Sequence, residues 1–217
     1  MARDGIAGDA PSKQRRVPPV ADAGQMRRAH RAARRALPPT LRSSAEHAVR
    51  DALLADPFLR RTRRIGAYLA LGGELDLGPY LDACLARGSE VYLPRLVRGG
   101  ARMCFARYDP GLSLARNRFG IAEPSRSAPA VAPRFLDAVL LPLLAFDSSG
   151  TRLGSGAGYY DRCFGFRNAR QAWHAPLLVG VAFASQEVPA LLRQPWDVPL
   201  DAVVTEQGLR RFPLAPR

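Results

Sequence analysis

Two segments near the N-terminus have the composition of helices. Residues 24–36 (GQMRRAHRAARRA) are rich in alanine and arginine, which favour helix, and they end before Pro38, which cannot continue one. A second helix is expected to begin at a Thr40 cap and to end at Asp56 and Pro57. Its apolar stripe is predicted to contain Leu41, Ala45, Ala48, Ala52 and Leu53.

Short, mostly apolar runs follow, and they have the length of buried strands. They occur at residues 65–71, 90–93, 102–107, 137–141, 177–184 and 202–205. Helical segments at 79–87 and 159–164 lie between some of them. Apolar strands that alternate with helices are typical of a mostly parallel sheet covered on both faces. The pattern predicts a single three-layer α/β/α domain, Rossmann-like, with an arginine-rich helical segment before it.

Length and composition limit the class of protein. A chain of 217 residues suits one domain, and residues 1–22, which lack periodicity, are expected to be a disordered tail before a domain at 23–217. No apolar run reaches the roughly 18–20 residues that span a bilayer, and the N-terminus has no apolar signal segment. Its three cysteines form no C-x-x-C motif. We expect a cytoplasmic protein without a membrane partner.

The net charge of +13 is concentrated near the N-terminus. Residues 1–64 hold 15 of the 32 basic residues against six acids. All basic residues except Lys13 are arginine, so the excess can reflect arginine-rich composition as well as a surface for nucleic acid or another polyanion. Phe58 is the only Phe, Tyr or Trp in this stretch, which argues against a platform for stacking bases.

The segment after the strand at 137–141 has the most distinctive chemistry. Gly154, Gly156 and Gly158 alternate there, so backbone N–H groups could approach an anion closely. The helix expected at 159–164 would add its N-terminus, which favours phosphate, and open α/β sheets bind ligands at this edge. The spacing of these glycines matches neither the P-loop nor G-x-G-x-x-G. Two interpretations of the loop therefore stay open, a site that binds phosphate and a purely structural turn.

Several carboxylates could act beside this loop. Asp161 suits Mg²⁺, which takes one or two carboxylates, phosphate oxygens and water, but it could equally stabilise the helix dipole. Asp197 and Asp201 could supply a second ligand or form a turn. Glu74 could face the same cleft or cap a helix. The three histidines lie far apart, and no nucleophile elbow is present.

Taken together, these segments resemble the 5-formyltetrahydrofolate cyclo-ligase family. The strongest match is FDSSGTRLGSGAGYYDR at 146–162. The resemblance covers about residues 23–206. Other segments of the family occur in the expected order along the chain. They are the arginine-rich first helix with RRALPP, AYLALGGELD (67–76), VYLPRL (91–96), RFGIAEP (118–124), VGVAFASQ (179–186) and WDVPLDAVVTE (196–206).

The resemblance implies a ligase of folate metabolism that uses ATP and Mg²⁺ to cyclise 5-formyltetrahydrofolate, including polyglutamylated forms, to 5,10-methenyltetrahydrofolate through a phosphorylated formyl group. Carried over by position, Asp161 and Asp197 would bind Mg²⁺. The catalytic residues would be Arg152, Gly154, Gly156 and Tyr160. ATP would contact Arg27, Arg152, Leu153, Gly154, Ser155, Gly156, Ala157, Gly158, Tyr159 and Tyr160. The folate would contact Leu69, Glu74, Ser155, Gly156, Ala157, Gly158 and Tyr159.

Two positions depart from the family pattern. Many members carry a basic residue where this chain has Ala23, so Arg28 or Arg31 compensates or ATP binding is weaker. Ala157 replaces a lysine that some relatives carry in the glycine loop. A paralogue with altered or lost activity therefore stays as an alternative to a monomeric enzyme. A nucleic-acid-binding protein that uses the basic N-terminal region is a second alternative.

Overall fold

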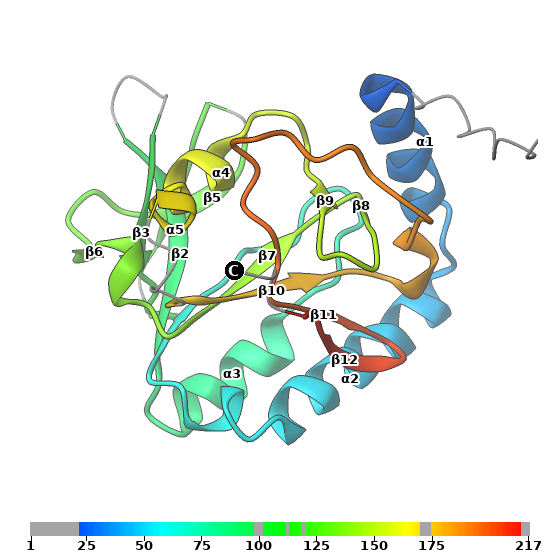
Figure 1. The fold of residues 1–217 in the computed structure, drawn as a ribbon. Helices are drawn as coiled ribbons and strands as arrows, with labels where there is room; N and C mark the ends of the chain where they lie inside the picture. Colours follow the sequence, from blue (N-terminus) through cyan, green and yellow to red (C-terminus); the bar gives the residue numbers. More distant parts are fainter. Residues whose placement is uncertain (1–21, 98–101, 112, 119, 170–174, 214–217) are drawn as a thin grey trace, which may run out of the picture.

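A computed structural model describes residues 22–97, 102–111, 113–118, 120–169 and 175–213. Its largest sheet has eight strands in the order β12-β11-β10-β7-β1-β2-β3-β6 (Figure 1). The bounds are β1 Arg64–Gly66, β2 Glu90–Leu96, β3 Met103–Arg107, β6 Ala130–Val131, β7 Ala138–Pro142, β10 Leu177–Val181, β11 Ala202–Thr205 and β12 Gly208–Arg211. The five strands from β11 to β2 are parallel, whereas β12, β3 and β6 pair antiparallel. The predicted mostly parallel sheet is confirmed.

Helices cover both faces of this sheet, as Figure 1 shows. Apolar side chains of α2 (Pro39–Ala55) and α3 (Gly78–Ala86) pack on one face with Ile65, Leu140 and Val204. On the other face, Phe164 of α4 (Tyr159–Phe164) and Phe166 of α5 (Phe166–Ala169) pack with residues of β7 and β10. The strand interiors are apolar throughout because both faces are buried. The three-layer arrangement is therefore confirmed.

Two N-terminal predictions need correction. The helix α2 begins at Pro39 after an N-cap at Pro38, so Thr40 does not cap it. Proline suits the first helical position because its missing N–H has no partner there anyway. The buried stripe is Ala45, Val49 and Leu53, and Leu41 is 59% exposed.

The helix α1 (Ala23–Arg35) agrees with the prediction, and Asp22 caps it by accepting a hydrogen bond from the Gly24 N–H. The predicted tail otherwise lies outside the described residues.

The strand expected at 65–71 is much shorter in the structure. The ladder of β1 with β2 ends at Gly66, and the Ala67 N–H makes one further hydrogen bond, 2.9 Å long, to the Tyr92 carbonyl. Beyond this point the chain turns at Gly72 and Gly73, both of which have positive φ. Ala67 and Tyr68 fill the core without pairing as a strand, whereas Leu71 is exposed.

Several short elements carry too few residues for a visible pattern. None of these short strands and single turns was predicted. They are the strands β4 (Leu114–Arg116), β5 (Ala122–Pro124), β8 (Ala145–Phe146) and β9 (Arg152–Leu153), and the 3-10 turns η1 (Leu59–Arg61), η2 (Pro133–Phe135) and η3 (Ala184–Gln186). None of the helices in the described ranges combines the length and hydropathy of a bilayer span.

The turn between β8 and β9 is tightly built around Asp147. Its carboxylate Oδ1 accepts hydrogen bonds from the backbone N–H groups of Ser149 and Thr151, and Oδ2 accepts one from the Leu191 N–H at 2.8 Å. Gly150 completes the turn at φ +80°, and its carbonyl accepts a hydrogen bond from the Leu200 N–H. The turn therefore ties the hairpin to the segment that precedes β11.

Gly150→Ala is expected to lower the free energy of unfolding by about 2–4 kcal/mol, because the new Cβ would lie 2.8 Å from the Leu200 carbonyl oxygen at a strained φ. Urea denaturation measures the change. Gly88→Ala is the matched control, since Gly88 has φ +82° but open space around its Cβ position, and it should cost only about 1–2 kcal/mol. Equal losses in the two variants would contradict the steric argument.

Candidate active site

The chain changes direction across the sheet at β1. From this central strand it continues to β2 on one side, and β7 lies on the other side. Open α/β sheets bind ligands outside the carboxyl ends of their strands at such a switch point. Two segments leave the sheet here, namely residues 67–74 after β1 and residues 143–146 after β7. The glycine loop follows β9 on the same side of the fold.

The glycine loop has the backbone geometry that the alternating glycines imply. Gly156 has φ +105° and Gly158 has φ +64°, a region that other residues rarely adopt. Gly158 occupies the N-cap position of α4, so the loop leads directly into the first turn of that helix. Ser155, Gly156 and Ala157 are exposed. Backbone N–H groups of this loop are thus available to an anion in solution.

Arg27 of α1 lies against this loop although it is far away in the sequence. Its Nε donates a hydrogen bond of 3.0 Å to the Gly154 carbonyl. A Cβ placed on Gly156 would lie 3.4 Å from the same Nε, so the absence of a side chain lets the guanidinium approach the backbone. The structure therefore brings the first helix to the glycine loop.

Arg152 and Asp161 form a partly buried ion pair beside the loop. The Arg152 Nη2 lies 2.6 Å from the Asp161 Oδ1, and the two side chains are 7% and 24% exposed. Arg152 also donates through Nη1 to the Val198 carbonyl, and the Val198 N–H donates to Asp161 Oδ1 at 3.2 Å. The pair therefore joins α4 to the segment that contains Asp197.

The two predicted metal ligands fit the donor set of Mg²⁺. Asp161 uses Oδ1 for the contacts above, and Asp197 uses Oδ2 to accept from the Gln194 N–H at 2.8 Å. Neither carboxylate uses its second oxygen in a hydrogen bond within the described ranges. No group of three or more His, Cys, Asp or Glu side chains among the described residues could hold a metal. Mg²⁺ needs only one or two carboxylates when phosphate and water supply the rest.

Glu74 lies in the turn after β1, beside buried tyrosines. Its Oε2 accepts a hydrogen bond of 3.1 Å from the Leu71 N–H, and its Oε1 lies 3.6 Å from Arg34 Nη1. Burial raises the pKa of Glu74, whereas the charge of Arg34 opposes that rise. The charge of Glu74 contributes to the raised pKa of Tyr160, which is mainly an effect of burial. Glu74 and Tyr160 are therefore close enough to interact.

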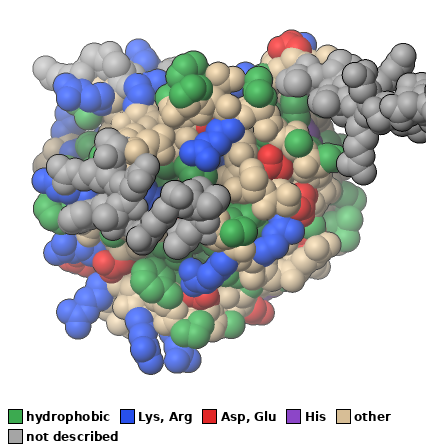
Figure 2. All heavy atoms as spheres, in the orientation of Figure 1, with side chains coloured by type: hydrophobic (Ala, Val, Ile, Leu, Met, Phe, Trp, Pro, Cys, Tyr) green, Lys and Arg blue, Asp and Glu red, His purple; other side chains and the backbone are tan. Residues whose placement is uncertain are grey.

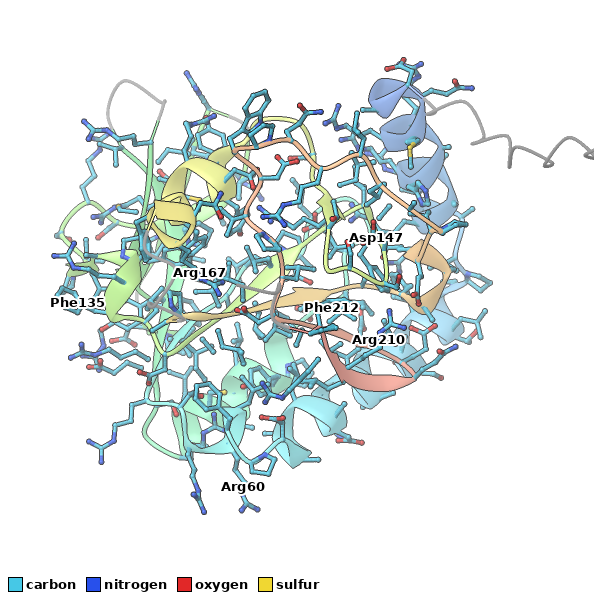
Figure 3. The ribbon with its side chains drawn as sticks, viewed as in Figure 1. Arg60, Phe135, Asp147, Arg167, Arg210 and Phe212 are labelled. Carbon is cyan, nitrogen blue, oxygen red and sulfur yellow. The ribbon has the colours of Figure 1, made fainter. Side chains whose placement is uncertain are left out.

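The other predicted residues lie in different surroundings. Leu69 is half-buried and packs against the core on the α2 and α3 face. Asp201 is paired with Arg167 at 2.7 Å and accepts from the Leu178 N–H at the start of β10, so it stands at the opposite end of the sheet. In Figure 3, Arg167 lies near α5, well away from Asp147 of the β8–β9 turn. Asp201 is therefore a structural residue.

Sequence reasoning missed three arginines at or near the site. Arg34 and Arg42 hold the turn that carries Glu74, and Arg118 donates to the Tyr159 hydroxyl at 3.2 Å. The only available signal was the spacing of Arg34 seven residues after Arg27, which places both on one face of α1. Cys163, beside Tyr160 in α4, is not a nucleophile at neutral pH because burial raises the pKa of its thiol to about 12.

Comparisons with known proteins identify the family. The chain matches the 5-formyltetrahydrofolate cyclo-ligase family over residues 20–206. It is 35% identical over 176 residues to the 5-formyltetrahydrofolate cyclo-ligase of Escherichia coli strain K12, which covers 79% of this chain and 93% of the relative. The protein of the same name from Mycolicibacterium smegmatis is 33% identical over 187 residues, which covers 83% of this chain and 92% of the relative.

Solved structures give the same result. The NMR structure of 5,10-methenyltetrahydrofolate synthetase from Aquifex aeolicus is 31% identical, with a TM-score of 0.74, and the match covers 87% of this chain and 92% of that one. The synthetase from Mycoplasma pneumoniae, at 21% identity and a TM-score of 0.68, shares the fold over 85% of this chain and 99% of that one. The chain belongs to the 5-formyltetrahydrofolate cyclo-ligase family of enzymes.

Proposed function

We propose that this protein uses ATP and Mg²⁺ to convert 5-formyltetrahydrofolate to 5,10-methenyltetrahydrofolate in the cytoplasm, releasing ADP and phosphate. The observation that supports this most directly is the position of α1. One face of this helix contacts the glycine loop through Arg27 and the turn of Glu74 through Arg34. A loop suited to phosphates and a carboxylate suited to a pterin therefore lie along one helix.

The proposed reaction requires the site mainly to position its two substrates. A formyl oxygen is a poor leaving group until it is phosphorylated, after which the N10 nitrogen of the folate can close the ring and phosphate can leave. Backbone N–H groups at 155–158 would hold the phosphates, and Glu74 would accept hydrogen bonds from the amino and ring N–H groups of the pterin. Arg152 would place positive charge beside the transferred group.

Asp161 and Asp197 would hold Mg²⁺ on the phosphate side of this arrangement. When bound, the ion would neutralise phosphate charge during transfer. Asp161 would do so with its second oxygen, since Oδ1 is already engaged by Arg152 and Val198. The pair with Arg152 would hold the carboxylate in position beside the loop.

A nucleic-acid role is less well supported. Arg27, Arg34 and Arg42, all from the basic N-terminal stretch, donate to backbone carbonyls of the protein itself. Basic side chains are spread over the face drawn in Figure 2 and do not form a single stripe. The paralogue alternative rests on Ala23, an exposed residue at the first position of α1, because alanine has no basic group to offer a ligand.

A direct assay tests the proposal. Purified protein with 5-formyltetrahydrofolate, ATP and Mg²⁺ should give the near-ultraviolet absorbance of the methenyl product, with one ADP formed per product. Reactions lacking ATP or Mg²⁺ are the controls. Absence of product over a range of pH and metal concentrations would overturn the proposal and favour the paralogue. Binding to DNA or RNA that weakens steeply with salt would support the nucleic-acid alternative.

Arg27→Ala is expected to raise the KM for ATP by about tenfold and the KM for the folate much less, because a charge-assisted contact to the glycine loop is lost. Steady-state kinetics with each substrate varied in turn measures both constants. Arg60→Ala is the matched control, since Arg60 is exposed on η1 and does not lie on α1. Equal effects of Arg27→Ala on both KM values would assign Arg27 a structural role only.

A further inference from the structure

Arg34 is a buried arginine at the C-terminal end of α1. It is 6% exposed, and it donates to two carbonyls that follow neighbouring strands of the sheet. Its Nη2 lies 3.3 Å from the Gly72 oxygen after β1, and its Nη1 lies 3.4 Å from the Leu143 oxygen after β7. Burying a guanidinium is costly unless it is paired, so a position of this kind calls for an explanation.

Two contacts of Arg34 are with the turn that carries Glu74. They hold the Gly72 side of the turn, and Arg42 holds its other side by donating to the Gly73 carbonyl and to the Arg34 carbonyl. The carboxylate of Glu74 follows this turn directly, 3.6 Å from Arg34 Nη1. The Nε of Arg34 is buried and has no partner within the described residues. The guanidinium is thus held through its two Nη atoms.

The surroundings of Glu74 show which groups act on its charge. Arg34 and Arg31 of α1 are the cations near it, and the Leu71 N–H donates to it. Tyr68 after β1 and Tyr160 of α4 are the titratable groups that Glu74 affects in turn, and Asp76 acts on Tyr68. Arg34 is the largest influence that favours the ionised carboxylate, and burial is the one that opposes it.

We propose that Arg34 is the positioning residue that holds the Glu74 carboxylate and the turn that carries it, so that the carboxylate is directed toward the pterin. This proposal rests on the proposed function of the site. Arg34 acts through Glu74 and the two strand-end carbonyls, and it does not touch the reacting atoms. It also links folate binding to the helix that contacts the glycine loop, because Arg27 and Arg34 lie on one face of α1.

A consequence concerns pH. Protonated Glu74 cannot accept two hydrogen bonds from the pterin, so kcat/KM for the folate should fall as pH drops through the pKa of this carboxyl group in the free enzyme. Loss of the Arg34 cation removes the main influence that keeps that pKa down. The acid limb of the profile should therefore move to higher pH when Arg34 is neutralised.

The experiment compares Arg34→Met, Arg34→Lys and Glu74→Gln with Arg35→Met, an exposed neighbour on the same helix. Kinetics from about pH 5 to pH 9 gives kcat and KM for each substrate. In Arg34→Met, the KM for the folate should rise about 10- to 100-fold, with a small change in the KM for ATP and an acid limb at higher pH. Arg34→Lys should restore the acid limb but only part of the affinity, because lysine keeps the charge and loses the fork.

The outcomes separate the two proposals. An acid limb that stays in place in Arg34→Met, or that shifts as far in Arg35→Met, would overturn the role of Arg34. A rise of both KM values by the same factor would also overturn it. If Arg34→Met fails to fold, Arg34→Lys carries the test, and a wild-type KM for the folate in that variant would contradict the proposal. Wild-type protein without cyclo-ligase activity would refute the proposed function itself, while direct titration with 5-formyltetrahydrofolate would still test whether Arg34 governs binding through Glu74.

Discussion

Arg152→Met is expected to reduce kcat/KM for ATP by about 100- to 1000-fold while the fold is retained. Arg152 is 7% exposed and holds two groups at once, the Asp161 carboxylate and the Val198 carbonyl. Methionine replaces only the unbranched aliphatic part of the side chain and has no donor, so the carboxylate would lose its cation and the segment before β11 would lose its tether to the loop. Under the proposed function, the transferred phosphoryl group would also lose positive charge beside it.

Steady-state kinetics with ATP varied gives the size of this effect. Arg60→Met is the matched control, because Arg60 is exposed on η1 (Figure 3) and far from the glycine loop. A circular dichroism spectrum and a thermal transition close to those of the wild type would show that the protein is folded. Retention of more than about a tenth of kcat/KM in Arg152→Met would show that this arginine has only a structural role.

The sheet could be predicted because its signal is local. The interior strands β7, β10 and β11 are apolar from end to end, and this property is visible in the sequence alone. The end of β1 could not be predicted, since residues 67–71 stay apolar after they leave the sheet. An apolar loop and a buried strand can have the same hydropathy, and only the position of the partner strand distinguishes them.

The glycine loop was recognisable from spacing, whereas the arginines that support it were not. Gly156 and Gly158 need positive φ, and alternating glycines record that need directly in the sequence. Arg34 and Arg42 look like any other arginine in a chain with 32 basic residues. Their importance depends on which carbonyls the fold places near them, and that is decided by tertiary packing.

The same argument changes the interpretation of the charge. Part of the basic excess in residues 1–64 can be traced to contacts within the fold, because Arg27, Arg34 and Arg42 connect α1 and α2 to loops at the carboxyl edge of the sheet. Under the proposed function, these contacts place positive charge around the sites of two anionic substrates. The local excess therefore fits a compact anionic ligand better than a long polyanion.

Asp161→Asn is expected to remove most of the turnover, by about 100-fold or more, with the fold retained. Asparagine keeps the shape of the side chain and one oxygen acceptor, so the Val198 N–H can still be satisfied. It removes the negative charge that Mg²⁺ would need and leaves Arg152 without its ionic partner. Activity should respond to higher Mg²⁺ concentrations, because the remaining ligands bind the ion more weakly.

Asp197→Asn separates the metal role of Asp161 from its ion pair. The Asp197 carboxylate forms no ion pair in the described part of the chain, and it accepts a hydrogen bond from the Gln194 N–H. Arg193 donates only to the backbone carbonyl of Asp197. If both carboxylates bind Mg²⁺, both variants should need more Mg²⁺ for half-maximal rate, and only Asp161→Asn should also lower the rate at saturating metal. Asp51→Asn, on the exposed side of α2, is the control. An unchanged Mg²⁺ requirement in both variants would leave Asp161 as the partner of Arg152 alone and would place the metal elsewhere.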